Sequence, residues 1–177
     1  MKYDIIILGS GPGGYVTAIR ASQLGFKVAI VEKENLGGIC LNWGCIPTKA
    51  LLKSAQVYDY LKHVDDYCLK AEAIDKDFGA VIKRSRNVAD GMSKGVQFLM
   101  KKNKIEVIDG FGKLKTSKKM DVTDAEGKVT EYSADHIIIA TGARSRELPS
   151  LPQDGKKVIG YREAMTLPSQ PKKMIVV

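Results

Sequence analysis

The chain has 177 residues, a formal net charge of +8, 44% apolar residues and 27% charged residues. This composition is that of a soluble globular protein with enough apolar side chains for a core, and the length suits one domain or one domain with part of a second. No apolar run approaches the roughly 20 residues needed to span a membrane, and the N-terminal residues lack the apolar stretch and cleavage site of a signal peptide. We therefore expect a cytoplasmic protein that is not bound to a membrane.

The positive charge is scattered along the chain. Lysines and arginines occur from Lys2 to Lys173 and never more than two in succession. No segment resembles a DNA-recognition helix or an aromatic- and glycine-rich RNA-binding strand. The charge therefore predicts a solvated basic surface that suits an anionic cofactor, and no nucleic-acid partner.

The first elements form a strand, a helix and a second strand. Residues 3–8 are a short apolar run ended by glycines, which predicts a buried strand. Residues 15–24 have helical spacing, and Gly25 is placed to end that helix. Residues 27–31 predict the next strand, and such a βαβ start favours a parallel sheet.

The rest of the chain alternates helices with short strands. Pro47 suits the start of a helix that runs to about Tyr60. Residues 77–103 have one apolar face, and we expect the methionines of this helix, Met92 and Met100, to lie in the core. Strands are expected at residues 105–114, 120–123, 129–132 and 136–140, and a further strand opens at residues 173–177 after a proline-rich linker.

Three glycines after the first strand have a specific spacing. Gly9, Gly11 and Gly14 form a G-x-G-x-x-G motif that follows a strand and opens a helix, and Glu32 ends the next strand 18 residues later. In such motifs the glycines allow a sharp turn, backbone approach to a pyrophosphate, and close packing of helix on strand. The helix N-terminus favours phosphate, and Glu32 can accept hydrogen bonds from ribose hydroxyls. The motif predicts a dinucleotide site without deciding between FAD and NAD, and a turn without a ligand is its alternative.

Cys40, Cys45 and Cys68 make an odd number of cysteines. Cytoplasmic proteins do not keep structural disulfides, so the close pair Cys40 and Cys45 indicates redox chemistry or a metal. Five residues of regular helix rise about 7.5 Å, beyond the Cα separation of about 7 Å that a disulfide tolerates. A bond therefore needs an irregular turn, which Gly44 and Pro47 make possible, and a bond closed in this way is expected to be reducible.

The residues that follow Cys45 support a redox role. Cys45 lies at the start of the helix that Pro47 opens, where the helix dipole favours a thiolate, and Lys49 lies one turn further on the same face. A zinc site needs four nitrogen or sulfur ligands, and His63 and His136 do not group with the cysteines. Two inert core cysteines are the remaining alternative.

The segment from Gly37 to Lys49, GGICLNWGCIPTK, resembles the redox segment of class I pyridine nucleotide-disulfide oxidoreductases, which are flavin disulfide reductases. The glycine motif, Glu32, this segment and Ala140-Thr141-Gly142 match the family in order, so the resemblance covers essentially the whole chain. Leu41-Asn42 and the residues after the second cysteine are most similar to dihydrolipoamide dehydrogenases. Glutathione reductases more usually carry valines and a second lysine there. Glutathione and mercuric reductases are the alternatives within the family.

The resemblance implies an α/β fold, with a Rossmann-like FAD-binding domain (parallel sheet with helices) and an inserted small antiparallel β-sheet. We expect the N-terminal part of the FAD-binding domain at residues 1–148, with the redox segment at 37–49 and the β insertion at about 105–133. Residues 149–177 are expected to be a linker and the first strand of a truncated NAD-binding domain. On this interpretation the chain is a fragment.

The resemblance also implies roles for individual residues. Cys45 would face the flavin, Cys40 would exchange with the substrate thiol, and Lys49 would lie near the flavin. Cys68 matches no family motif and is expected to be a spectator. Gly112 would approach the adenine, with an ordinary strand glycine as the alternative. The implied FAD-binding residues are Gly9, Gly11, Pro12, Gly13, Gly14, Glu32, Lys33, Gly37, Gly38, Cys40, Lys49, Gly112, Ala140, Thr141 and Gly142, and no metal site is expected.

The implied parent enzyme oxidises dihydrolipoamide, free or on a lipoyl domain, to lipoamide with NAD+ as acceptor, through FAD and a Cys40–Cys45 disulfide. It would be a homodimer within 2-oxoacid dehydrogenase complexes. Neither histidine matches the family's acid–base residue and no second G-x-G-x-x-G follows, so we expect the chain alone to be inactive. Two other classes stay open: a dinucleotide-binding module without disulfide chemistry, and a nucleic-acid-binding or interaction protein driven by the positive charge.

Overall fold

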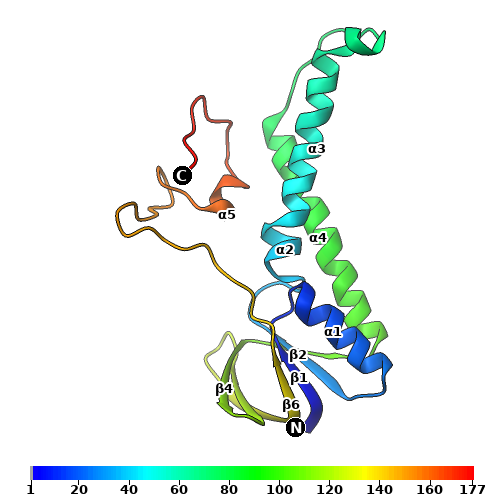
Figure 1. Ribbon diagram of the computed structural model, residues 1–177, viewed down its shortest axis with the longest axis vertical. Coiled ribbons are helices and arrows are strands. Elements are labelled where there is room, and N and C mark those ends of the chain that lie inside the picture. Colours follow the sequence, from blue (N-terminus) through cyan, green and yellow to red (C-terminus); the bar gives the residue numbers. More distant parts are fainter. Residues whose placement is uncertain (1) are drawn as a thin grey trace. The chain divides into compact units, whose positions relative to one another are not determined.

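The computed structural model describes residues 2–177 as a mixed α/β protein (Figure 1). The chain divides into two compact units. The first contains the residues up to Asn42 together with Asp90–Arg144, and the second contains Trp43–Ala89 together with Ser145–Val177. The strands of the described residues all belong to the first unit.

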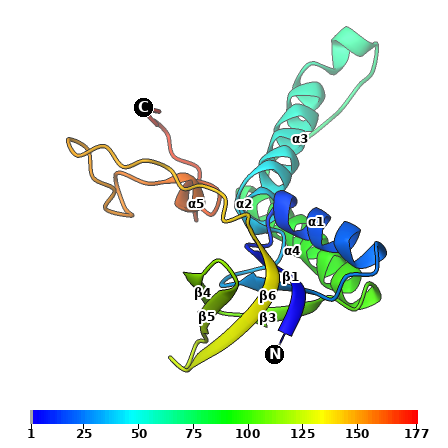
Figure 2. The ribbon, with the colours of Figure 1, turned by 60° about the horizontal axis from the view of Figure 1, so that its bottom comes forward.

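The first unit is built on one six-stranded sheet with the order β3-β2-β1-β6-β5-β4. Its strands are β1 Lys2–Leu8, β2 Val28–Glu32, β3 Glu106–Asp109, β4 Phe111–Thr116, β5 Lys119–Thr123 and β6 Val129–Ile139. The pairs β1–β2, β1–β6 and β2–β3 are parallel, and the pairs β4–β5 and β5–β6 are antiparallel. Figure 2 shows β6 between β1 and the hairpin of β4 and β5. The predicted α/β class is confirmed.

The predicted βαβ start is also confirmed. Helix α1, Pro12–Gln23, connects β1 to β2 and lies alongside the sheet in Figures 1 and 2. Ile6 of β1 is opposite Ala29 of β2 and Ile137 of β6. Ile6 and Ile7 are both 0% exposed, as expected for a central parallel strand that is covered on both faces.

The antiparallel strands are part of the same sheet. The sequence predicts separate strands at residues 129–132 and 136–140, but β6 is one continuous strand. Ser133 of β6 pairs with Lys119 of β5 on one side and with Lys2 of β1 on the other. The antiparallel strands therefore extend the parallel sheet through the long β6, where the sequence had predicted a small sheet of their own.

Gly110 divides the single strand that is predicted at residues 105–114. It lies between β3 and β4 and has a φ of +149°. Its N–H donates to the Glu32 carbonyl (2.8 Å), and a Cβ there would lie 2.5 Å from the Thr123 carbonyl oxygen. Glycine fits this crossing, where the chain leaves its parallel pairing with β2 and begins the antiparallel hairpin.

The sheet carries a contiguous hydrophobic core. Its buried members are Tyr3, Ile6, Ala29, Val31, Ile108, Met120, Val122 and Ala134. Burial raises the pKa of the Tyr3 phenol, and a hydrogen bond with Glu106 raises it further. The phenol therefore stays protonated near neutral pH, which suits a side chain in the core.

Helices lie between β2 and β3 along the chain. They are α2 Gly38–Trp43, α3 Cys45–Lys62, the 3-10 helix η1 Val64–Tyr67 and α4 Phe78–Lys102, and a short α5, Tyr161–Ala164, follows the sheet. Pro47 lies in the first turn of α3, where its missing N–H needs no intrahelical acceptor. The helix predicted at residues 77–103 is α4, whereas α2 and α5 were not predicted. Between Lys2 and Val177, no helix combines the length and apolarity needed to cross a membrane.

The apolar face predicted for α4 is only partly buried. Met92 is 45% exposed and Val88 is 37% exposed, whereas Ala89, Val96 and Met100 are 2%, 4% and 1% exposed. The prediction that the methionines of this helix lie in the core is therefore wrong for Met92 and confirmed for Met100. Sequence spacing alone does not determine which apolar residues of a helix are covered.

The strand predicted at residues 173–177 does not form. No other segment of the described chain pairs with these residues, and Ile175, Val176 and Val177 are 90%, 88% and 88% exposed. A strand needs a neighbour to accept and donate its backbone hydrogen bonds. The assignment of this segment to an NAD-binding domain stays a prediction.

We expect Met120→Ala to lower the free energy of unfolding by about 2–5 kcal/mol, because the Met120 side chain is fully buried and its removal leaves a cavity. Met92→Ala is the matched control, since Met92 is largely exposed, and should change stability by less than about 0.5 kcal/mol. Urea denaturation followed by circular dichroism measures both. Equal losses would contradict this assignment of the core.

Candidate functional site

The glycine motif lies at the carboxyl ends of the parallel strands. Gly9 follows β1 with a φ of +99°, and its N–H donates to the Val31 carbonyl (2.8 Å). A Cβ on Gly9 would lie 2.4 Å from the Ala140 oxygen, and a Cβ on Gly14 would lie 1.9 Å from the Gly9 oxygen. Backbone atoms occupy the space of both missing side chains, so the turn requires glycine at both positions.

The N-terminus of α1 is open to approach. Gly11 is the N-cap, no side chain caps the helix in the described structure, and Pro12 is its first residue. A Cβ on Gly11 or Gly13 would meet no described atom within 4 Å. The first N–H groups of a helix lack intrahelical partners and carry partial positive charge. This end of α1 therefore fits the phosphates of a dinucleotide.

Glu32 ends β2, and its carboxylate reaches the glycine turn. Its Oε2 accepts from the N–H (2.9 Å) and the hydroxyl (2.6 Å) of Ser10, and its Oε1 accepts from the N–H groups of Lys33 and Glu34 (2.9 Å each). These four donors fill a carboxylate, which has about four acceptor positions. A ribose hydroxyl must therefore displace one of them. The Ser10 hydroxyl is the donor that can rotate away without moving the backbone.

A second glycine loop packs against the first. The N–H of Gly37, which has a φ of +96°, donates to the Ser10 carbonyl (3.1 Å). Gly38 has a φ of +60°, and a Cβ there would lie 2.7 Å from the Gly11 Cα. The two loops are thus in backbone contact, which explains the need for glycine at residue 38. At Gly37 the positive φ and the Leu41 side chain, 2.6 Å from an added Cβ, disfavour any other residue.

Two polar residues to which the sequence analysis assigned no structural role hold these loops. Ser10 is 0% exposed and orients Glu32. Asn42 is 6% exposed, and its Nδ2 donates to the carbonyls of Leu36 (3.0 Å) and Gly38 (2.9 Å). Ser10 lies within the G-x-G-x-x-G motif and Asn42 within the redox segment. Their positions in these motifs were the only sequence signal that could have indicated a structural role.

The end of β6 lies beside the same turn. The Ala140 N–H donates to the Leu8 carbonyl (2.8 Å), and Thr141 and Gly142 follow, the latter with a φ of +71°. Ala140 is also the neighbour that excludes a side chain from Gly9. The first unit thus gathers the predicted residues at the ends of β1, β2 and β6 around one helix N-terminus.

Gly112 lies in β4, within the sheet. A Cβ there would lie 2.5 Å from Leu8 Cδ1 and 3.0 Å from Met120 Sδ. Packing in the core is therefore sufficient to explain this glycine, and contact with an adenine stays a prediction. Lys33 lies outside the core, with its ammonium 5.9 Å from the centre of the Phe111 ring.

The redox segment contains the predicted irregularity. Cys40 lies in α2, Cys45 is the first residue of α3, and Gly44 between the helices has φ −139° and ψ −113°, which is not helical. Cys45 and Lys49 are both exposed on α3. The structure records the cysteines as thiols, so the Cys40–Cys45 bond stays a prediction.

The remaining candidates lie apart from these motifs in the sequence. Cys68 caps η1 in a left-handed conformation (φ 56°) and is exposed. His63 ends α3, where its Nδ1 is 2.9 Å from the Asp59 carbonyl oxygen, and His136 lies within β6 opposite Ile5. Within the described part of the chain, no group of three or more potential ligands could hold a metal ion.

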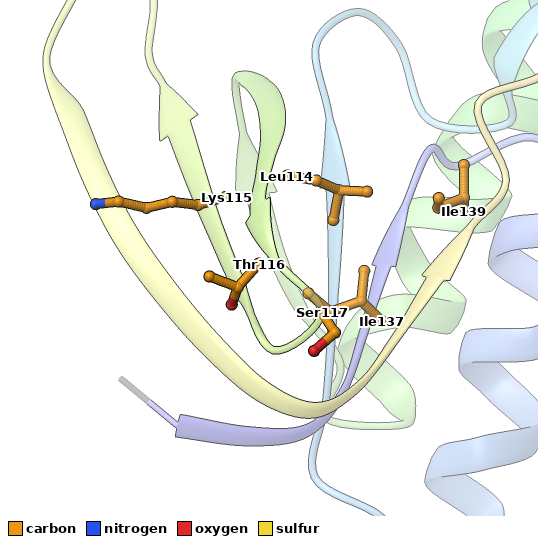
Figure 3. A pocket seen from close by; sticks show the side chains of 6 residues that line it. All are labelled: Leu114, Lys115, Thr116, Ser117, Ile137 and Ile139. Atoms are coloured by element: carbon orange, nitrogen blue, oxygen red, sulfur yellow. The ribbon is translucent and has the colours of Figure 1, made fainter.

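An open hollow on the sheet has a volume of about 450 Å³. Figure 3 shows the side chains that line it. The hollow is lined by Leu114, Lys115, Thr116, Ser117, Ile137 and Ile139. The Lys115 side chain points away from the two isoleucines and donates to Glu131 Oε2 (2.8 Å). No predicted site residue lines this hollow, so it is not part of the candidate site.

Comparison with known proteins assigns the family. The sequence matches the family described as pyridine nucleotide-disulphide oxidoreductase over residues 3–177. The chain belongs to this family. Dihydrolipoyl dehydrogenases of Zymomonas mobilis and Rhizobium etli are 51% and 52% identical to it over 99% of the chain, and the chain covers 38% and 40% of their lengths.

A solved structure of LpdA from Mycobacterium tuberculosis has the same fold. It matches with a TM-score of 0.84 and 25% identity, over 96% of this chain and 38% of that protein. The chain thus spans about 38% of the length of the Zymomonas mobilis dihydrolipoyl dehydrogenase that it matches.

We expect Gly14→Ala to destabilise the glycine turn by about 3 kcal/mol, because the added Cβ overlaps the Gly9 carbonyl at 1.9 Å and the backbone must shift. Gly13→Ala is the control in the same turn, since its Cβ meets open space. Thermal unfolding of both variants measures the difference. A Gly14→Ala protein as stable as Gly13→Ala would show that the turn is not packed in this way.

Proposed function

We propose that this chain supplies the FAD-binding and redox-disulfide part of a dihydrolipoyl dehydrogenase. The observation that carries the proposal is the match over 99% of the chain, at 51% identity, to a protein of that name. The geometry supports it, because an open helix N-terminus, an acidic residue at the end of β2 and a paired-cysteine segment occur in one chain. The enzyme would oxidise a dihydrolipoyl dithiol with NAD+.

The glycine turn fits the phosphates of FAD. The N–H groups at the start of α1 would bind the pyrophosphate, because the space outside Gly11 and Gly13 is open. Glu32 would accept from the ribose in exchange for the Ser10 hydroxyl. Lys33, Gly37, Gly38, Gly112 and residues 140–142 complete the proposed set. When bound, FAD supplies a two-electron acceptor that the protein side chains do not provide.

The cysteines would carry out dithiol–disulfide exchange. One substrate thiolate attacks the Cys40 sulfur of the Cys40–Cys45 bond, which releases the Cys45 thiolate. The second substrate thiolate then attacks the mixed disulfide, so that the substrate leaves as a cyclic disulfide and both cysteines are reduced. Two electrons have then passed from substrate to protein, and Lys49, one turn beyond Cys45 on the exposed face of α3, is the cation available beside this chemistry.

The remaining parts of the proposal rest on the sequence and on its family resemblance. NAD+, a lipoyl-domain substrate, a homodimer within 2-oxoacid dehydrogenase complexes and a cytoplasmic location are parts of the same proposal. Glutathione or mercuric reductase activity is less well supported, because the relatives from Zymomonas mobilis and Rhizobium etli are named dihydrolipoyl dehydrogenases. A dinucleotide-binding module without disulfide chemistry remains the competing class. It differs in that its cysteines would stay thiols under oxidising conditions.

Glu32→Ala should weaken FAD binding by about 1.5–3 kcal/mol, or roughly 10- to 150-fold in Kd, because a charge-assisted hydrogen bond to the ribose is lost. Flavin fluorescence during titration of the apoprotein measures the Kd. Glu126→Ala is the control, since Glu126 is exposed in the turn between β5 and β6. Unchanged flavin affinity in Glu32→Ala would remove Glu32 from the proposed site.

Thiol titration under denaturing conditions tests the redox pair. The oxidised protein should show one reactive thiol, Cys68, and the protein treated with dithiothreitol should show three, because the chain has three cysteines. Cys68→Ser should give none and two, respectively. Three thiols in both states of the unsubstituted chain would instead support the module without disulfide chemistry.

A further inference from the structure

The only tryptophan of the chain lies within the redox segment. Trp43 is the last residue of α2, three residues after Cys40 and two residues before Cys45. Its indole is partly buried. The family resemblance and the proposed exchange reaction assign it no role.

Two arginines lie over this indole. The guanidinium carbon of Arg86, from α4, is 4.8 Å from the ring centroid, and that of Arg162, from α5, is 5.1 Å away. Both distances lie within the roughly 6 Å range of cation–π attraction. Arg162 is itself oriented, because its Nε donates to the Tyr161 hydroxyl (3.4 Å). All three members of the Trp43 cluster (Trp43, Arg86 and Arg162) belong to the second unit.

The arrangement requires arginine and tryptophan together. Two guanidinium groups repel each other, and among the aromatic side chains the negative face of an indole attracts cations most strongly. The planar guanidinium also stacks on a ring, which a lysine ammonium does not do equally well. The Trp43 cluster therefore fixes one residue of the redox segment to α4 and α5, which lie far from it in the sequence.

We propose that Trp43 is a positioning residue for the Cys40–Cys45 pair, held in place by Arg86 and Arg162. This inference rests on the proposed function, since it requires a redox disulfide. Only Gly44 separates Trp43 from Cys45, and a single helix, α2, joins Trp43 to Cys40. A fixed indole restricts the backbone between the two cysteines, so the reduced chain has less conformational entropy to lose when the bond closes.

The predicted consequence is a shift in redox equilibrium. When the indole is released, the two thiols meet less often, so the disulfide becomes easier to reduce. We expect Trp43→Leu and Arg162→Gln each to lower the equilibrium constant for disulfide formation about tenfold, which is about 30 mV for a two-electron couple. Arg162→Lys should restore part of the loss, because it keeps the charge but not the planar stack.

The experiment equilibrates the flavin-loaded protein in glutathione redox buffers and counts the thiols trapped by alkylation and mass spectrometry. Arg146→Gln is the matched control, since Arg146 is an exposed arginine in the same unit and outside the Trp43 cluster. Circular dichroism confirms folding of each variant, and Arg162→Gln keeps the test decisive if Trp43→Leu does not fold. The emission of the single tryptophan reports independently whether Arg162 has left the ring.

The outcomes separate the two proposals. A shifted equilibrium in Trp43→Leu and Arg162→Gln, with Arg146→Gln unchanged, supports the positioning role. Changed tryptophan emission in Arg162→Gln without any shift in the equilibrium overturns it, because the indole would then be released without effect on the cysteines. No glutathione-dependent change in the unsubstituted protein would overturn the redox pair itself, and with it this inference.

Discussion

The architecture of the first unit depends on one place where two backbone segments pass too close together for any side chain to fit between them. The backbone of residues 9–14 passes so close to Ala140 and to itself that no Cβ fits at Gly9 or Gly14. This closeness places the start of α1 directly at the carboxyl ends of β1, β2 and β6, where parallel sheets offer their binding edge. The same tight packing brings the Gly37–Gly38 loop onto Gly11 and leaves only the outer side of the turn open. An anionic ligand would meet main-chain N–H groups and few side chains.

The redox segment is attached to this glycine turn through Gly37 and Gly38, the glycines with which the segment begins. The Gly37 loop is bonded to Ser10, and Asn42 binds the carbonyls of that loop from within α2. The helix that carries Cys40 is thus tied to the dinucleotide turn, and the helix that carries Cys45 begins after the single non-helical residue Gly44. In the proposed enzyme, one continuous run of motifs would bind the cofactor and present the cysteines.

The sequence was most informative where residue type is forced by the backbone. The glycine turn, the βαβ start and the break between the cysteines follow from positions at which only glycine fits or a helix cannot continue. It was least informative where neighbours decide. Met92 and Met100 are both apolar residues of α4 that the sequence does not distinguish. Only tertiary packing determines that Met100 is buried and Met92 is exposed. Ser10 orients the site through a hydrogen bond to the Glu32 carboxylate, and Asn42 does so through backbone carbonyls. No residue pattern displays these bonds.

The proposed function requires one chain to hold both a flavin and a reducible cysteine pair. Anaerobic titration of the flavin-loaded protein with dithionite, followed by absorbance, measures the electrons that the protein accepts. We predict four electrons per flavin, two for FAD and two for the disulfide, and two electrons in a Cys40→Ser variant. Uptake of only two electrons by the unsubstituted protein would contradict the proposed function.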